Sequence, residues 1–441
     1  MSNKILKEDR PHVAALGNAT DFFAAEPESL RTLRAAAYER FAALGYPGRE
    51  REEWKYNVLA LAELQRMTPL GAEAGDLAAE AVTSLRALAG DAPLLVFVDG
   101  IYRPQQSALG ELPAGLELTP LTGGECPAEL GAVAQTEDAA FAALNTAFWR
   151  DGVAVRMAAG ARLDGPLELL FVTTPAAHGH MVSPRTLIVA ESGSEVTVLE
   201  NYVSVADEPL LTNPLTEVIC AGTATVNHLK LLREGDRSWH VGSTHVRQDA
   251  ASVYRSREFI LGSEMARREL HVALAGAEAH CDLGALYLGS GSQRRDLRTR
   301  IDHQACDCNT STLYKGILGD RSRGVFDGQI RVAPGASGTD ARQTNRNLLL
   351  SDDATANSIP RLEIYNDQVQ CTHGSTTGQI AEEQLFYLRA RGFDPEAARA
   401  ILTHAFAAEL LEDLEPPALR ELLSDELLRR LPRGELIEAL S

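Results

Sequence analysis

The sequence predicts a mainly β protein whose core is a parallel β-helix, preceded by an α/β region and followed by helices. Between about residues 151 and 378 the helical spacing of apolar residues disappears, and short segments rich in Val, Thr, Leu and Ile alternate with Gly, Asp and Asn. Hairpin signals such as Asn-Gly are scarce there, which favours a β-helix over a sandwich, although a jelly roll also fits this pattern. Turn-then-strand segments recur at steps of 28, 29 and 26 residues, which is typical of a solenoid; their anchors are Val196, Ala224, Val253 and Ala279.

The first 150 residues read as a mixed α/β region. Apolar residues at helical spacing predict helices over 20–45, 74–90 and 138–150. The apolar run 93–99 predicts a buried strand that turns at Asp99-Gly100. We therefore expect a first domain over residues 1–150.

The second expected domain, residues 151–378, is the β-helix core. No long helix separates its strands, which argues against a doubly wound sheet. The clearest predicted strands are 185–190, 195–203, 223–232, 252–260, 270–274, 279–288, 311–318, 325–332 and 362–370.

Helices return after Gly378 and form a third expected domain, residues 379–441. A helix over 380–391 is followed by Gly392, a favourable residue just beyond a helix end. Asp394-Pro395 provides an N-cap and a first-turn proline for a helix to about 413, and an acidic helical tail follows Pro416-Pro417. We expect these helices to cap the solenoid, as solenoids require.

Composition excludes several classes of function. The 441 residues carry 42 Lys and Arg against 61 Asp and Glu, a formal charge of −19, which disfavours nucleic acid or an anionic membrane as the main partner. Six cysteines are too few for a disulfide scaffold, and neither a signal peptide nor an apolar run of about 18 residues is visible. We expect a reduced, cytoplasmic protein.

Familiar catalytic motifs are absent from the sequence. It contains no G-x-x-x-x-G-K-[ST] phosphate loop, no G-x-G-x-x-G, no G-x-S-x-G and no H-E-x-x-H. It also lacks a C-x-x-C pair, so neither a structural zinc site nor a redox dithiol has a sequence signature. We therefore do not expect an enzyme.

The most informative short motif is Cys371-Thr372-His373. On a strand, positions i and i+2 share a face about 6.5–7 Å apart, and a thiolate with an imidazole suits iron, zinc or copper(I). Two donors cannot hold an iron–sulfur cluster, which usually takes about four, so a second surface would have to complete the site. The alternative is a buried small residue beside a strand-end histidine.

Other residues admit both functional and structural interpretations. Cys306 and Cys308 would share a face if 303–314 were a strand, although inward-facing core cysteines explain them equally. His178 and His180 lie in a Pro/Ala/Gly-rich turn. The polar and aromatic stretch from Arg51 to Asn57, which we call the Trp54 cluster, fits either a surface staple or a partner contact. Glu363 is expected to face solvent or pair with a cation. The helical stripes that include Leu385, Phe386, Leu388 and Phe406 fit either mutual packing or a groove for a partner protein.

The segment 339–392 resembles the SufB/SufD family of the SUF iron–sulfur cluster assembly machinery, and the resemblance extends over nearly the whole chain. Glu53-Trp54-Lys55-Tyr56 is similar to a tryptophan motif near the N-terminus of that family. Gly374 follows His373, and Cys371 is the last cysteine, which favours the SufD branch over the SufB branch. The densest matches are Asn345-Arg-Asn-Leu-Leu-Leu350, Pro360-Arg-Leu-Glu-Ile364, Cys371-Thr-His-Gly374 and Leu385-Phe-Tyr-Leu388.

The resemblance implies a right-handed parallel β-helix and a non-catalytic scaffold that pairs with SufB and docks the SufC ATPase. His373, with Cys371, would share transient iron or a nascent cluster with SufB at their interface, and no cofactor would be bound permanently. Residues 380–413, with Leu385, Phe386, Leu388 and Phe406, would match the SufC-docking region. The alternatives are a SufB-like or homodimeric scaffold, and a carbohydrate-active β-helix protein.

Overall fold

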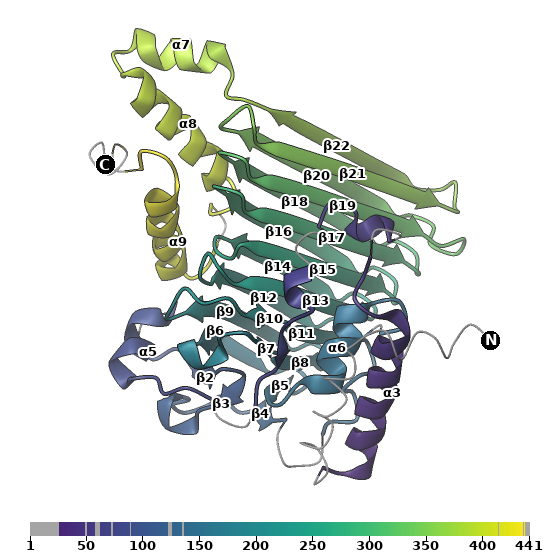
Figure 1. The fold of residues 1–441 in the computed structure, drawn as a ribbon. Coiled ribbons are helices and arrows are strands. Elements are labelled where there is room, and N and C mark those ends of the chain that lie inside the picture. Colours follow the sequence, from purple (N-terminus) through teal and green to yellow (C-terminus); the bar gives the residue numbers. More distant parts are fainter. Residues whose placement is uncertain are drawn as a thin grey trace, which may run out of the picture.

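Each coil of the core contributes one strand to each of two facing sheets, which we call sheet A and sheet B (Figure 1). The computed structural model describes residues 26–48, 51–57, 62–71, 74–88, 90–121, 126–134, 136–412, 414–434 and 436. From residue 152 to 378 the chain makes eight such coils, and every pairing between successive coils is parallel. The predicted parallel β-helix is therefore confirmed.

The strands keep a fixed order within each sheet. Sheet A runs β4 (Leu116–Pro120), β5 (Gly152–Met157), β8 (Arg185–Ala190), β11 (Leu215–Cys220), β13 (Trp239–Gln248), β15 (Met265–Leu274), β17 (Arg294–His303), β19 (Arg323–Val332) and β21 (Thr355–Ile364), with the short strands β1 (Thr68–Pro69), β7 (His180–Val182) and β10 (Leu211–Thr212) at its side. Sheet B runs β3 (Ile101–Tyr102), β2 (Leu94–Val98), β6 (Arg162–Thr173), β9 (Glu195–Ser204), β12 (Thr225–Arg233), β14 (Val253–Ile260), β16 (His280–Gly289), β18 (Asn309–Leu318), β20 (Asp340–Leu349) and β22 (Gln370–Gly378).

Register is constant along the stack although coil length varies. One inward row of sheet B steps by 30, 28, 27, 29, 31 and 30 residues; its members are Val196, Val226, Tyr254, Cys281, Thr310, Ala341 and Cys371. The anchors predicted from sequence fall within two residues of this row. The turns absorb the differences in length, because a slip of one residue would move the buried side chains to the wrong face.

One predicted strand and one predicted helix end elsewhere. The predicted strand 362–370 was wrong, since residues 365–369 form the turn between β21 and β22, where the Asn366 side chain accepts the Gln368 N–H at 2.8 Å. The strand over 303–314 that would have placed Cys306 and Cys308 on one face does not form, because β17 ends at His303 and Asp307 adopts φ 58° in the turn before β18. The helix expected over 74–90 is only α5 (Ala79–Leu85), because the buried Glu168 carboxylate accepts the backbone N–H groups of Ala87 and Leu88.

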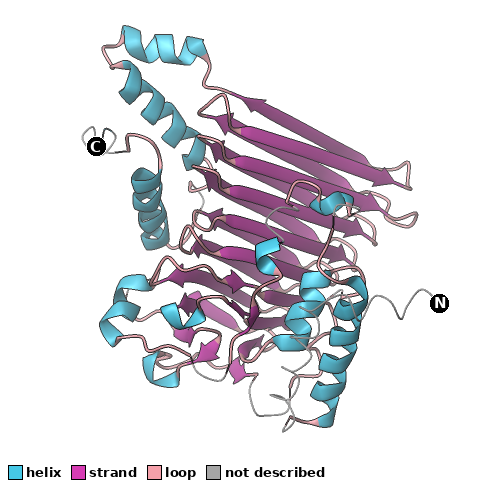
Figure 2. Cartoon of the chain, viewed as in Figure 1, coloured by secondary structure: helices cyan, strands magenta, loops and turns pink. Residues whose placement is uncertain are grey.

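Helices cover the outer faces of the sheets (Figure 2). In the N-terminal region α3 (Glu28–Leu44) packs on α6 (Ala140–Phe148), and α6 packs on the outer face of sheet A. Residues 20–25 of the first predicted helix lie outside the described residues. The remaining short elements are the 3-10 helices η2 (Glu52–Trp54), η3 (Pro104–Gln106) and η4 (Pro175–Ala177).

The C-terminal helices are confirmed as α7 (Glu382–Ala390), α8 (Pro395–Ala408) and α9 (Pro417–Arg430). The Asp394 side chain caps α8 by accepting the N–H groups of Glu396 and Ala397. Leucines of α9 and of the segment between α8 and α9 pack along the outer face of sheet B rather than over the last coil. The last part of the predicted tail, residues 435 and 437–441, lies outside the described residues.

The interior between the sheets is mostly apolar but contains buried ion pairs. Arg268 pairs with Glu258, and Glu200 pairs with Lys230 at 3.1 Å and with His228 at 3.0 Å, all almost fully buried. Such groups stabilise a fold only when every charge is paired and hydrogen-bonded. None of the described helices is long and apolar enough to cross a membrane.

A buried carboxylate also ties the N-terminal region to sheet A. Glu217 and Arg185 form an ion pair in which neither side chain is exposed, and Glu217 accepts backbone N–H groups from Gly131, Val133 and Ala134. Burial alone would raise the pKa of Glu217, but Arg185 and these three N–H groups lower it.

We expect Glu217→Gln to destabilise the protein by about 3 kcal/mol or more, because Arg185 would remain buried without a counter-charge. Urea denaturation followed by circular dichroism measures this change. Glu195→Gln, which breaks the exposed pair with Arg162, is the matched control and should cost less than about 1 kcal/mol. Equal effects of the two substitutions would contradict the role of Glu217.

His303 makes stability depend on pH. Burial lowers its pKa to about 4, against about 6.5 in an unfolded chain, so the unfolded state binds more protons between these values. Its contribution is complete above pH 6.5 and is lost as the pH falls toward 4, by about 3 kcal/mol. Unfolding free energies measured across this range should fall less steeply in His303→Gln than in the wild type. The exposed His280→Gln control should keep the wild-type slope.

Candidate functional site

The solenoid ends in an exposed edge strand. β22 is the last strand of sheet B and, among the strands described, pairs with β20 alone. Cys371 is its only half-buried residue, and the other eight are exposed. Because no further coil stacks on β22, the inward side chains of the last coil face solvent.

Cys371 and His373 both belong to the inward row of β22. Cys371 packs against the interior cluster beside Ala341, its register partner on β20. His373 lies two positions further along and therefore points to the same side. Its register partner Gln343 donates a hydrogen bond across the interior to the carbonyl oxygen of Gly328 in sheet A. The structure thus brings the two predicted donors together at the open end.

By themselves, Cys371 and His373 are too few donors to hold a metal ion or cluster. Burial, followed by the nearby Asp340 carboxylate, raises the pKa of the Cys371 thiol, so a metal ion would have to displace its proton. In the part of the chain that the structure describes, no group of three or more His, Cys, Asp or Glu side chains is placed to hold a metal. One thiol and one imidazole supply two of the roughly four donors that an iron–sulfur centre needs.

The backbone of β22 is open to pairing. The Gln370 N–H bonds to Thr339 on the preceding coil, so the alternate residues Cys371, His373, Ser375 and Thr377 turn their N–H and C=O groups toward the free edge. The strand contains no proline and no charged residue, the features that usually protect an edge.

The edge of sheet A is different. Thr355 and Tyr365 donate to the preceding coil, so even-numbered residues of β21 face its free edge, and Pro360 stands in the middle of that row without an N–H. The end of the solenoid therefore offers an uninterrupted backbone ladder on sheet B and an interrupted one on sheet A.

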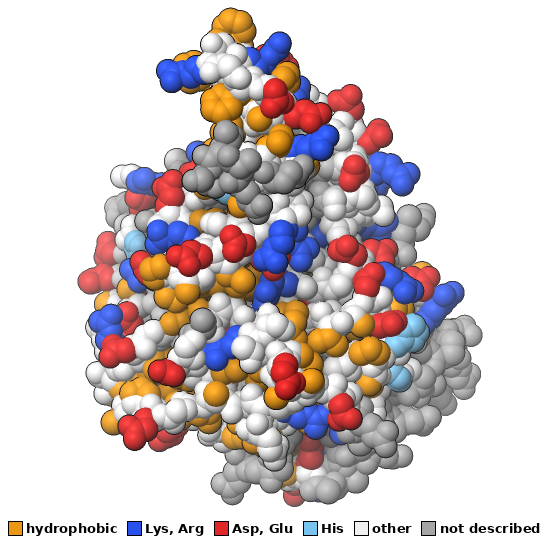
Figure 3. Space-filling model, turned by 90° about the vertical axis from the view of Figure 1, so that its left-hand side faces the viewer, with side chains coloured by type: hydrophobic (Ala, Val, Ile, Leu, Met, Phe, Trp, Pro, Cys, Tyr) orange, Lys and Arg blue, Asp and Glu red, His pale blue; other side chains and the backbone are white. Residues whose placement is uncertain are grey.

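α7 and the first part of α8 form an arm that projects past β22 (Figure 1). Hydrophobic side chains gather on this arm, at the top of Figure 3, and the large exposed ones are Phe386 (72% exposed) and Tyr387 (56%). Of the predicted partner residues, Leu385 is buried, and Leu388 is half-buried. The sequence-based prediction omitted Tyr387, although it lies inside the quoted Leu-Phe-Tyr-Leu motif.

Phe406 lies at the root of the arm. The Lys315 ammonium on β18 donates to the Phe406 carbonyl oxygen at 2.7 Å, lies 4.5 Å from its ring centroid and pairs with Glu409. Glu409 also pairs at 3.3 Å with Arg346, the register partner of Lys315 on β20. One carboxylate at the end of α8 therefore bridges two successive coils.

The remaining predicted residues take structural positions. Cys308 is buried at the end of the turn that leads into β18, where its thiol donates to the Gly276 carbonyl oxygen, and Cys306 is half-buried in the same turn. His178 pairs with Glu208 at 2.6 Å, and the amide of Gln329 bonds to Glu363 on the outer face.

Within the Trp54 cluster, Trp54 itself is buried, whereas Glu52, Lys55 and Tyr56 are exposed. Trp54 is 4% exposed, and the guanidinium carbon of Arg267 lies 3.8 Å from its ring centroid. Arg267 in turn donates to the Glu53 carbonyl oxygen and to Asp296. This motif fixes the N-terminal region on sheet A.

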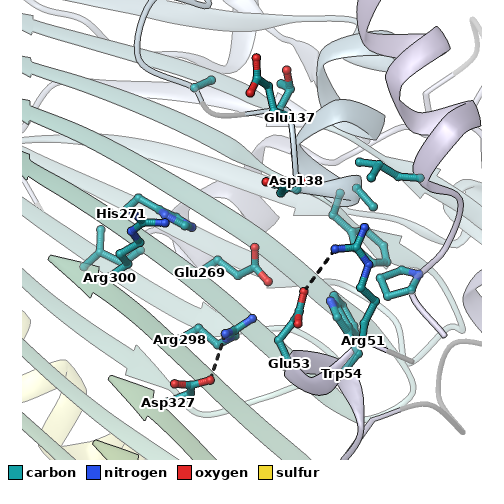
Figure 4. Close-up of a pocket in the computed structure, with 18 of the residues that line it drawn as sticks. Arg51, Glu53, Trp54, Glu137, Asp138, Glu269, His271, Arg298, Arg300 and Asp327 are labelled. Carbon is teal, nitrogen blue, oxygen red and sulfur yellow. Dashed lines mark hydrogen bonds and ion pairs between the residues drawn. The ribbon is translucent and has the colours of Figure 1, made fainter. Parts of the chain in front are cut away.

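A cavity of about 770 Å³ opens between the outer face of sheet A and segments 44–47, 51–54, 132–134 and 136–141 (Figure 4). Glu269, Arg298 and Asp327 occupy one register row of three successive coils there, so that charges alternate, and Arg298 pairs with Asp327 at 3.0 Å. Sequence reasoning missed this cavity because its residues are about 30 positions apart and form no linear motif. Alternating charge at the coil period is the signal that could have found it.

Comparisons with known proteins agree with this geometry. Residues 18–169 match the SufBD protein N-terminal region, and residues 171–406 match the SufBD core domain of SUF system FeS cluster assembly. An iron–sulfur cluster assembly SufBD family protein of Synechocystis is 30% identical over 90% of both chains. The iron–sulfur cluster assembly protein SufD of Escherichia coli is 32% identical over 88% of this chain and 90% of its own. A chloroplastic protein of Arabidopsis thaliana is 27% identical over 91% of this chain and 86% of its own.

The two matched regions together span most of the solenoid and the N-terminal region. The relatives align over nearly their full lengths, so the family relationship is established. The chain belongs to the SufBD family of the SUF system for iron–sulfur cluster assembly.

Proposed function

We propose that this chain is a SufD-type, non-catalytic, cytoplasmic scaffold subunit that pairs with a SufB-type partner and docks a SufC-type ATPase. The observation that carries the proposal is the open end of the solenoid, where Cys371 and His373 stand together on an edge strand that nothing in the described chain covers. Iron or a nascent cluster is the cargo of this site and is not held permanently.

The partner would complete both the sheet and the site. A strand added to β22 would use the free N–H and C=O groups of Cys371, His373, Ser375 and Thr377. A second solenoid end placed there would stack its own inward side chains over Cys371 and His373. Partner thiolates could then supply the donors that this chain lacks.

The arm supports the docking of an ATPase. Phe386 and Tyr387 are large aromatic side chains exposed on one helix, the kind of anchor that dominates protein interfaces. The arm joins the solenoid at two places: the short link from Gly378 to α7, and the contact of Glu409 with Lys315 and Arg346. Movement of the arm would therefore act directly on β22 and β20.

A second candidate is a homodimeric scaffold. Two copies joined end to end through β22 would bring together two thiols and two imidazoles, which is the number of donors a cluster needs. Co-expression with SufB-type and SufC-type proteins distinguishes the two. Recovery of a complex that contains all three supports the first proposal, and an iron-binding homodimer alone supports the second.

His373→Ala should lower the iron retained by the reconstituted complex at least about tenfold, because the site loses one of its few donors. Cys371→Ser should lower it as well, and Thr372→Ala, on the opposite face of the same strand, should not. Anaerobic Fe²⁺ titration and the visible absorbance of the assembled cluster measure the effect. Unchanged iron content in His373→Ala would rule out the ligand role.

The double substitution Phe386→Ala and Tyr387→Ala should weaken ATPase docking by about 2 kcal/mol or more, since truncated aromatic anchors cost this much at interfaces. Isothermal titration of the complex with the ATPase measures the loss. Val205→Ala, which shortens an exposed apolar side chain at the other end of the core, is the control. Full affinity in the double variant would show that the ATPase docks elsewhere.

A further inference from the structure

Three buried amide side chains lie directly beneath the edge strand. On β20, Gln343, Asn345 and Asn347 are 3%, 1% and 5% exposed. They are the register partners of His373, Ser375 and Thr377 on β22. Side chains at paired positions of neighbouring strands are about 4.8 Å apart, so each amide is the neighbour of one inward residue of the edge.

Two of these amides, those of Asn345 and Asn347, use their hydrogen-bonding groups mainly within the interior. Asn345 donates to the Tyr287 hydroxyl at 3.1 Å and to the Tyr314 carbonyl oxygen at 3.2 Å, and its own oxygen accepts from Asn347 at 2.8 Å. The Asn347 oxygen accepts from the Tyr287 hydroxyl, and its nitrogen donates to Thr377 at 3.4 Å. Both therefore serve to hold the last coils together.

Gln343 is oriented differently. Its Nε2 donates to the Gly328 carbonyl oxygen at 3.2 Å, on the opposite sheet. Because only the nitrogen of the amide can donate, this bond fixes which way the amide faces. Among the described residues, no group donates to its Oε1, so the carbonyl oxygen of this largely buried side chain has capacity to accept a hydrogen bond.

Gly328 makes room for this orientation. A Cβ at position 328 would lie 2.4 Å from Gln343 Nε2 and 2.5 Å from the Phe326 ring, closer than any side chain tolerates. The absence of a side chain at Gly328 and the direction of the Gln343 amide are therefore parts of one arrangement. It leaves a free carbonyl acceptor on Gln343, the register partner of His373 in the inward row of β22.

We propose that Gln343 is the positioning residue of His373: after a rotation of the exposed imidazole ring, which makes no hydrogen bond to Gln343 in this structure, the Gln343 Oε1 accepts one imidazole N–H and thereby directs the other ring nitrogen toward the open end. This inference rests on the proposed function, in which His373 holds iron or a nascent cluster. Histidines that bind metals commonly donate their second N–H to a carbonyl or carboxylate, which fixes the tautomer and the ring orientation. Here the acceptor is a side chain of the preceding coil. The imidazole of His373 would therefore already be oriented when the metal-binding side chains of the partner approach it.

The test replaces the acceptor while keeping the volume of the side chain. Gln343→Met should weaken Fe²⁺ binding by the reconstituted complex about 10–100-fold, the usual effect of losing such a partner. Imidazole ¹⁵N shifts of His373 in the full chain should report one dominant tautomer in the wild type and a mixture in Gln343→Met. Gln329→Met, a glutamine on the outer face of β19, is the matched control and should change neither.

A second variant guards against misfolding at position 343. Gly328→Ala leaves Gln343 in place but obstructs its amide, so it should shift the His373 tautomer in the same direction while urea denaturation still shows a cooperative transition. Wild-type tautomer and Fe²⁺ affinity in Gln343→Met, with a loss in His373→Ala, would overturn this inference and leave the proposed function standing. No loss in His373→Ala would overturn both.

Discussion

The stacking of residues at equivalent positions of successive coils determines the architecture of this molecule. In a parallel solenoid every inward side chain rests on the residue at the same position one coil earlier and supports the one that follows. The row from Val196 to Cys371 shows that this register holds although coil length varies between 27 and 31 residues. The rule has an unavoidable consequence at a terminal coil, because its inward residues are supported from one side only.

The two ends of the stack differ in how these inward residues, which are supported from one side only, are covered. At the first coil, β2 and β4 extend the two sheets, and Leu95, Phe97 and Leu116 fill the interior. At the last coil the interior row turns polar. Of the helices that could have covered it, α9 lies along the side of sheet B, and α7 projects past β22. An apolar row left open would favour aggregation, whereas Cys371, His373, Ser375 and Thr377 tolerate water and can also bind a partner.

Sequence reasoning succeeded where the signal is local or periodic. The solenoid, the order of the three regions and the Asp394 cap of α8 follow from composition, repeat spacing and capping chemistry. It failed where a distant side chain decides the local structure: Glu168 ends α5 early, and Asn366 makes a turn inside a predicted strand. It also could not place Gln343 beside His373 or Glu269 beside Arg298, because residues about 30 positions apart meet only once the register is known.

The chemistry of the open end suits a cargo that must leave. A neutral imidazole is a more easily exchanged ligand than a thiolate, and a thiol whose pKa is raised by burial regains its proton when the metal departs. Both donors lie on a strand that is held by hydrogen bonds on one side only and is continuous with the arm through a three-residue link. A force on the arm would therefore reach the donors before it disturbs the interior, where paired charges and stacked coils resist displacement. Rigidity in the stack and freedom at its last strand are thus the two properties that the proposed binding and release of iron would require.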